Sequence, residues 1–188
     1  DQIQEAVASV VANHPRARHW HVDYLDTGPD TPVGDRLRLA RPLVADEEMF
    51  FANYSDVLTD VSLDDMVERM HASPAAAAMM LSVRPHATFH VINTREDDTV
   101  SGFHLLEELP IRENGGYLIM RQSFFDHLGG GRDLDAAFAE LLPTRRLIAY
   151  RHDGFWLPAD TFKERAQLDA MYGSGNVPWG RRDMVTVP

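Results

Sequence analysis

The chain has 188 residues, of which 44% are hydrophobic and 25% are charged, a composition typical of one globular domain. It carries 18 basic and 29 acidic side chains, for a formal net charge of −11, which argues against a nucleic-acid surface because such surfaces are basic. The absence of cysteine excludes disulfides, thiolate nucleophiles and zinc–thiolate sites.

No stretch of the sequence approaches the roughly 18–20 apolar residues that a membrane-spanning helix requires. The first residues, DQIQEAVASVVANHP, carry neither the basic segment nor the cleavage site of a signal peptide. These features predict a cytoplasmic protein with no membrane or nucleic-acid partner.

The first part of the chain mixes helical and extended patterns. Ile3 and Val7 share a helical spacing, so residues 1–14 predict an amphipathic helix. Residues 18–26 alternate apolar and polar side chains, as a strand does. Turn residues then lead into a short helix predicted over residues 36–44.

Strands and helices alternate through the rest of the chain. Residues 48–56 predict a strand that ends in polar side chains, and Ser62 predicts the N-cap of a helix over residues 62–73. Residues 75–85 fit a helix or a strand, and their position between two clear elements favours a strand. Further strands are predicted at 89–94, 100–106, 116–121 and 146–152, and further helices at 123–128, 133–143 and 160–172. The pattern predicts one α/β domain over residues 1–188, with a mixed, mostly parallel sheet flanked by helices.

Two aspartates follow predicted strands at distant points in the sequence, Asp56 and Asp160. One interpretation is local: Asp56 lies in a turn, and Asp160 caps the last helix. The other is a magnesium site, because Mg²⁺ prefers oxygen ligands and often takes only one or two carboxylates plus substrate phosphates. Both interpretations stay open from these residues alone.

Asn114 and Gly115 precede a predicted strand. An asparagine amide can bind hydroxyl groups, and a glycine lets a ligand approach the backbone. An Asn-Gly turn between strands explains the same pair equally well. The glycine run at 129–131 lacks the lysine of a phosphate loop and predicts a turn between helices. The histidine pairs at 19–21 and 86–90 are too few for a typical zinc site.

Four segments in order resemble the sugar-1-phosphate nucleotidyltransferases, specifically the glucose-1-phosphate cytidylyltransferase branch. They are YLDTGPDTPVGDRLRLARPLV at 24–44, MFFANYSDVLTDVSL at 49–63, ENGGYLIM at 113–120, and AYRHDGFWLPADTFKERAQLDAMYGSGNVPWG at 149–180. The resemblance implies a Rossmann-like nucleotide-diphospho-sugar transferase fold. It also implies that a sugar-1-phosphate attacks CTP and releases pyrophosphate, in a homo-oligomeric enzyme.

The resemblance also implies functional residues. Asp56 and Asp160 match the two aspartates that hold Mg²⁺ in the family and are the expected catalytic positions. The expected substrate contacts are Gly34 and Arg36 for the nucleotide, and Glu107, Glu108, Asn114, Gly115 and Trp156 for the sugar phosphate.

The chain departs from the family pattern in several places. It has no match to the family's first βα unit with its glycine-rich loop, and no lysine lies near residues 104–110, where the family binds the sugar phosphate. Ser55 and Asp35 stand where the family has glycine. Three hypotheses follow: an active enzyme whose first unit lies outside this sequence, a divergent enzyme with another acceptor, or a non-catalytic homologue that serves as a binding or oligomerisation partner.

Overall fold

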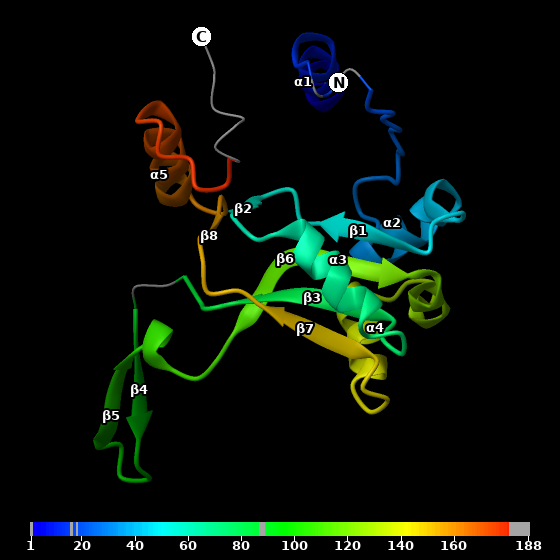
Figure 1. Cartoon of the computed structure of the whole chain (residues 1–188). Helices are drawn as coiled ribbons and strands as arrows, with labels where there is room; N and C mark the ends of the chain where they lie inside the picture. The colour runs from blue at the N-terminus through cyan, green and yellow to red at the C-terminus, as the bar shows by residue number, and fades with distance from the viewer. Residues whose placement is uncertain (1, 16, 18, 87–88, 181–188) are drawn as a thin grey trace.

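The centre of the molecule is a four-stranded sheet with the strand order β1-β6-β3-β7 (Figure 1). The computed structural model describes residues 2–15, 17, 19–86 and 89–180. The strands are β1 (Met49–Asn53), β3 (Ala78–Val83), β6 (Glu113–Arg121) and β7 (Leu147–Arg151). β1, β3 and β7 lie within segments that the sequence predicts to be extended, whereas β6 begins three residues before its predicted start at residue 116.

The sheet is mixed, as predicted, but its neighbouring strands are mainly antiparallel. β6 pairs antiparallel with both β1 and β3, and only the β3–β7 pair is parallel. The helical crossovers do give β1, β3 and β7 one common direction. β6 inserts between β1 and β3 in the opposite direction, because a β-hairpin rather than a helix connects β3 to β6. Three of the four strands therefore share one direction, in agreement with the predicted mixed, mostly parallel sheet, and β6 is the exception.

Helices cover both faces of this sheet (Figure 1). The methionines of α3 (Leu63–His71) pack on one face with Met79 of β3. Helix α4 (Leu134–Leu141) and the 3₁₀ helix η3 (Gln122–His127) pack on the other face with Ala78. Burial on both faces explains why β3 is an almost unbroken apolar run instead of an alternating one.

Two helix starts test the capping predictions. Ser62 caps α3, because its hydroxyl accepts a hydrogen bond from the Asp65 amide at 3.1 Å. Helix α5 (Phe162–Gly173) begins after Thr161, whose hydroxyl accepts from the Glu164 amide while the Glu164 carboxylate accepts from the Thr161 amide. This reciprocal capping box replaces the cap predicted at Asp160.

The N-terminal part contains two α-helices and no described strand. Helix α1 (Gln2–Asn13) confirms the first prediction, and α2 (Val33–Ala40) continues into the 3₁₀ helix η1 (Arg41–Val44). Residues 19–26 are extended but unpaired, which corrects the predicted strand. Trp20 is 61% exposed, so this alternating pattern has no sheet to pack against.

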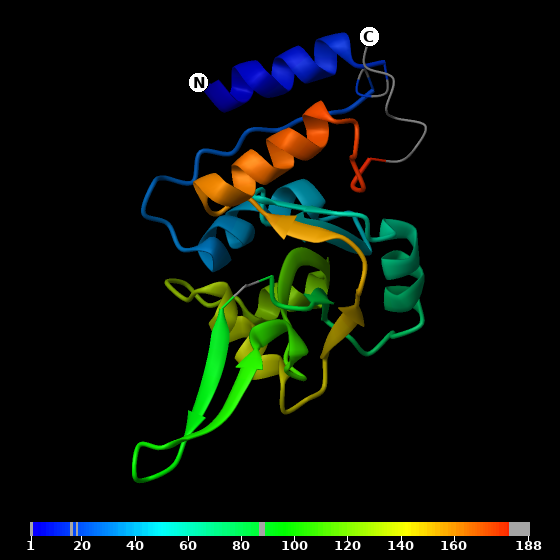
Figure 2. The same ribbon diagram turned by 90° about the vertical axis from the view of Figure 1, so that its left-hand side faces the viewer.

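Two pairs of short strands lie outside the central sheet. β2 (Val57–Thr59) pairs antiparallel with β8 (Trp156–Pro158). β4 (His90–Thr94) and β5 (Val100–Leu105) form a hairpin that projects from the body of the molecule, and the 3₁₀ helix η2 (Leu106–Glu108) follows it (Figures 1 and 2).

None of the helices that the structure describes is long and apolar enough to cross a membrane.

We expect Gly34→Ala to destabilise the protein, because a Cβ at Gly34 would lie 2.6 Å from the carbonyl oxygen of Arg132. Overpacking against backbone costs about 1–3 kcal/mol. Gly130→Ala is the matched control, since nothing lies within 4 Å of its added Cβ. Urea denaturation of both variants measures the difference, and an equal stability of the two would contradict this packing role.

Candidate functional site

A bulge in β6 places two glycines beside the candidate site. The register between β3 and β6 shifts between Met80 and Ser82, so the carbonyls of Gly115 and Gly116 are available to other segments. The indole nitrogen of Trp156 donates to the Gly115 carbonyl at 2.8 Å, and the Tyr54 amide donates to the Gly116 carbonyl at 2.8 Å. The bulge thereby joins β6 to β8 and to the end of β1. It also corrects the Asn-Gly turn interpretation, since both residues lie within the strand.

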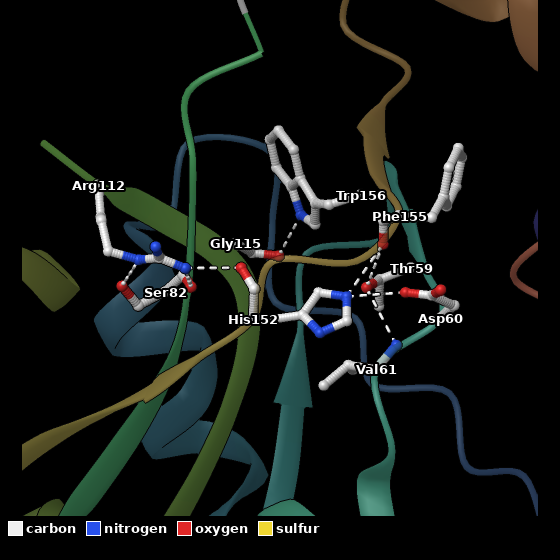
Figure 3. Close-up of polar contacts among 9 residues, drawn as sticks. All are labelled: Thr59, Asp60, Val61, Ser82, Arg112, Gly115, His152, Phe155 and Trp156. Atoms are coloured by element: carbon white, nitrogen blue, oxygen red, sulfur yellow. Dashed lines mark hydrogen bonds and ion pairs between the residues drawn. The ribbon is translucent and has the colours of Figure 1, made fainter. Parts of the chain in front are cut away.

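Arg112 connects the ends of β3 and β7 (Figure 3). Its guanidinium donates to the Ser82 hydroxyl at 2.9 Å and to the Ser82 carbonyl at 2.7 Å. It also donates to the His152 carbonyl at 2.6 Å and to the Asp153 carboxylate at 2.9 Å. The Arg112 side chain is only 18% exposed, so its positive charge is committed to these acceptors.

His152 forms a hydrogen-bonded pair with Asp60, which directly follows β2 (Figure 3). The His152 Nε2 atom lies 2.8 Å from an Asp60 carboxylate oxygen and 3.3 Å from the Phe155 carbonyl oxygen. The Thr59 hydroxyl donates to the same carbonyl at 2.8 Å. These contacts fix the segment between β7 and β8 against β2.

A cavity of 170 Å³ opens beside this network. Two residues predicted to contact the sugar phosphate, Glu107 and Trp156, line it together. The other lining residues are Val83, Arg84, Pro85, His86, His152, Asp153 and Gly154. The cavity therefore combines an aromatic ring and a carboxylate with an arginine and histidines.

The backbones that carry Asp56 and Asp160 are adjacent. Val57 pairs with Pro158, and the Ala159 amide donates to the Asp56 carbonyl at 2.7 Å. Both aspartates are exposed. Burial raises the pKa of Tyr54, and the nearby charges of Asp135 and, more weakly, Asp56 raise it further.

This arrangement fits a magnesium ion that takes few protein ligands. No group of three or more histidines and carboxylates with metal-site geometry occurs among residues 2–15, 17, 19–86 and 89–180. Two aspartates on adjacent backbones are the donor set that Mg²⁺ uses when substrate phosphates and water complete its octahedron. The role of Asp56 and Asp160 as metal ligands stays a prediction.

The remaining predicted residues have partners within the protein. Arg36 donates to the carbonyls of Thr31 and Pro29 at 2.8 Å each and to the Thr27 hydroxyl at 2.9 Å. The Asn114 side-chain oxygen accepts from the Gly116 amide at 3.1 Å, inside the bulge.

Two other predicted contacts lie in local structure. Gly34 packs against the backbone of residues 132–134, and the Glu108 carboxylate accepts from the Leu105 amide at 3.4 Å. Substrate contacts for Gly34, Arg36, Glu108 and Asn114 stay predictions.

Sequence reasoning missed four residues of the network: Arg84, Arg112, His152 and Asp153. Each lies near a strand end, and Arg84 and Arg112 flank the hairpin that connects β3 to β6. Arginines before and after this hairpin are the only sequence signal that could have indicated a shared site.

We expect Arg112→Gln to lower the free energy of unfolding by about 2–4 kcal/mol, because it leaves partly buried carbonyls without a charged donor. Arg84→Gln is the control: its side chain is 65% exposed, so its loss changes stability by at most about 1 kcal/mol. Urea denaturation followed by tryptophan fluorescence measures both. Equal effects of the two variants would refute the special position of Arg112.

The ion pairs of Asp153 predict that the stability of the protein depends on pH in the acid range. Hydrogen bonds from Arg112 and then Arg84 hold its pKa below the usual 3.8. Its stabilising contribution is present above pH 3.8 and is lost as the pH falls through the lower folded pKa. The difference in Tm between the wild type and Asp153→Asn is thus expected to shrink below that pH. A difference that stays constant through the acid range would exclude this contribution.

No protein-family model matches the chain. Among curated proteins, it is 27% identical over 177 residues to the glucose-1-phosphate cytidylyltransferase of Salmonella typhimurium, and 27% identical over 177 residues to that of Salmonella typhi. Each alignment covers 89% of this chain and 65% of the relative. The chain thus spans less than two thirds of the length of these relatives.

Two solved structures illustrate the similarity in fold. A UTP-bound UGPase from Acinetobacter baumannii has a TM-score of 0.65 at 16% identity, covering 93% of this chain and 67% of that one. A UDP-glucose pyrophosphorylase complexed with UDP-glucose has a TM-score of 0.62 at 13% identity, covering 92% and 73%. The chain is therefore related in sequence to the glucose-1-phosphate cytidylyltransferases and has the nucleotide-diphospho-sugar transferase fold, as the resemblance implied.

Proposed function

We propose that this protein acts as a nucleotidyltransferase that joins a sugar-1-phosphate to CTP, giving a CDP-sugar and pyrophosphate. The observation that carries the proposal is the β2–β8 pair. It brings the backbones of Asp56 and Asp160 together, and β8 also contributes Trp156 to the cavity that Glu107 lines. The choice of CTP and of a glucose-1-phosphate-like acceptor follows the names of the curated relatives.

The reaction exchanges one phosphorus–oxygen bond for another. An oxygen of the sugar phosphate attacks the α-phosphorus of CTP, and the bond from that phosphorus to the oxygen bridging the α- and β-phosphates breaks. Pyrophosphate leaves with the electron pair, so no proton has to move. The protein's task is to bring two anions together in line, which depends on positioning and on local positive charge.

In this proposal Asp56 and Asp160 hold Mg²⁺, which when bound supplies positive charge to the reacting phosphates. Because both carboxylates are exposed, they can exchange water for a Mg²⁺ ion that arrives bound to substrate. The strand pair fixes the two backbones, so the site is largely formed before substrate binds.

The acceptor sugar is proposed to lie in the 170 Å³ cavity. The Trp156 indole offers an apolar face to the sugar ring, and its orientation is fixed by the hydrogen bond to Gly115. The carboxylate of Glu107 can accept from sugar hydroxyls. Contacts from Glu108 and Asn114 to the sugar phosphate are proposed from the family resemblance alone. Gly34 and Arg36 are proposed to lie on the nucleotide side.

A non-catalytic role is the second candidate. The observation that favours it is that Lys163, on α5, is the only lysine in the chain, so the sugar-phosphate lysine of the family has no direct replacement. Such a homologue would act as a binding or oligomerisation partner. The cytoplasmic location and the homo-oligomeric state also stay predictions.

We expect Asp56→Asn and Asp160→Asn each to reduce Mg²⁺-dependent pyrophosphate release by about 100-fold or more, because each removes an anionic oxygen ligand. The assay supplies CTP and glucose-1-phosphate. Both variants should unfold at the wild-type temperature, since both side chains are exposed. Asp169→Asn, an exposed aspartate on α5, is the control and should keep full activity.

Wild-type turnover in Asp56→Asn would rule out the assigned metal site. A wild-type protein that releases no pyrophosphate, and shows no CTP or Mg²⁺ binding by calorimetry, would instead support the non-catalytic candidate.

A further inference from the structure

The cavity beside Trp156 contains an ion pair that a ligand can exchange. Asp153 has two arginine partners: Arg112 at 2.9 Å and Arg84 at 3.3 Å. The two arginines differ in exposure, with 18% of the Arg112 side chain and 65% of the Arg84 side chain accessible. One cation is therefore fixed, and the other faces the open cavity.

Arg84 can leave Asp153 at little cost. Exposed ion pairs contribute little to stability, and Asp153 keeps the shorter contact to Arg112 when Arg84 moves. Arg112 itself cannot exchange, because it is also bound to the Ser82 side chain and to the carbonyls of Ser82 and His152. Asp153 would otherwise compete with a ligand for Arg84, but its charge is already neutralised by Arg112.

The charge of the chain makes such a cation necessary. At −11 the protein repels an anionic ligand unless positive charge is concentrated locally. The only lysine, Lys163, does not line the cavity. His152 is engaged with Asp60, so Arg84 is the permanent positive charge that the cavity offers, and His86 stands beside it as a second donor.

We propose that Arg84 binds the phosphate group of the acceptor, with its sugar ring on Trp156 and its hydroxyls on Glu107. This inference rests on the proposed function and deepens it, because it assigns to an arginine before the hairpin the phosphate contact for which the chain has no lysine. Guanidinium suits this task, since its planar donors can bind two phosphate oxygens at once.

The cavity also limits the size of the acceptor. Its 170 Å³ is below the roughly 300–1,000 Å³ of sites for drug-sized ligands. It suits a monosaccharide phosphate, with the phosphate at Arg84, and is too small for a whole nucleotide.

The first test is direct binding to the full chain, measured by calorimetry without CTP. The wild type should bind glucose-1-phosphate at least about 10-fold more tightly than glucose, and Arg84→Gln should lose that preference. Arg84→Lys should restore part of it, because it keeps the charge but not the planar donors. The control Arg69→Gln removes an exposed arginine that lies on α3 and should leave binding unchanged.

The second test is kinetic. Arg84→Gln should raise the KM for glucose-1-phosphate by about 10- to 100-fold while the KM for CTP changes by less than about 2-fold. If the wild type turns over and Arg84→Gln retains the phosphate preference and the KM, this inference is wrong while the proposed function stands. If the wild type neither binds glucose-1-phosphate nor releases pyrophosphate, the proposed function fails, and this inference with it.

Discussion

The candidate site depends on how one partly buried cation satisfies the ends of two parallel strands. Ser82 is the last residue of β3 that pairs with β7, and His152 directly follows β7. Their carbonyls lie in a partly buried place and need donors. Arg112 supplies both, and the His152 amide also donates to the Ser82 carbonyl at 2.9 Å. Because the guanidinium is rigid and planar, it fixes the direction in which the chain leaves β7. The positions of His152, Asp153 and Trp156 follow from that direction.

The β6 bulge is the second constraint, and it gives the Asn-Gly-Gly sequence a structural purpose. A Cβ at Gly115 would lie 2.9 Å from a Leu81 methyl carbon, and Gly116 has a φ of +75°, which other residues rarely adopt. The freed carbonyls accept from Trp156 and Tyr54. In the sequence, these glycines indicated that a ligand could approach the backbone. In the structure, they are required because other segments of the protein pack closely against them. The same segment can serve internal packing and ligand binding, because the bulge lies where β6 reaches the candidate site.

The sequence predicted those elements whose signals are local and strong. The helix after Ser62 is an example, since its cap identifies the start of a helix. The apolar run of β3 fitted a helix or a strand, and its position between two clearer elements favoured the strand that the structure shows. β2 and β8 escaped prediction because three-residue strands gain their stability from a partner about 100 residues away, which no local pattern encodes. Residues 19–26 show the converse: they alternate like a strand but have no partner. The paired aspartates could be predicted only through a family resemblance, and the Arg112 network not at all, since it joins strand ends by tertiary contacts.

The distribution of arginines explains how so acidic a chain can face anionic substrates. Most arginines near the sheet are committed to carbonyls: Arg36 to its own loop, Arg112 to the strand ends, and Arg121 to the Met70 carbonyl at 3.0 Å. Arginine suits this work because its charge cannot be removed near neutral pH and its five donors can bridge several segments. An arginine held in this way is not free to leave, because its departure would leave these carbonyls without a hydrogen-bond donor. Arg84 differs because its partner Asp153 also binds Arg112, which is held more firmly. An arginine is thus available to a ligand when its acceptor in the protein keeps another hydrogen-bond donor after the arginine moves away.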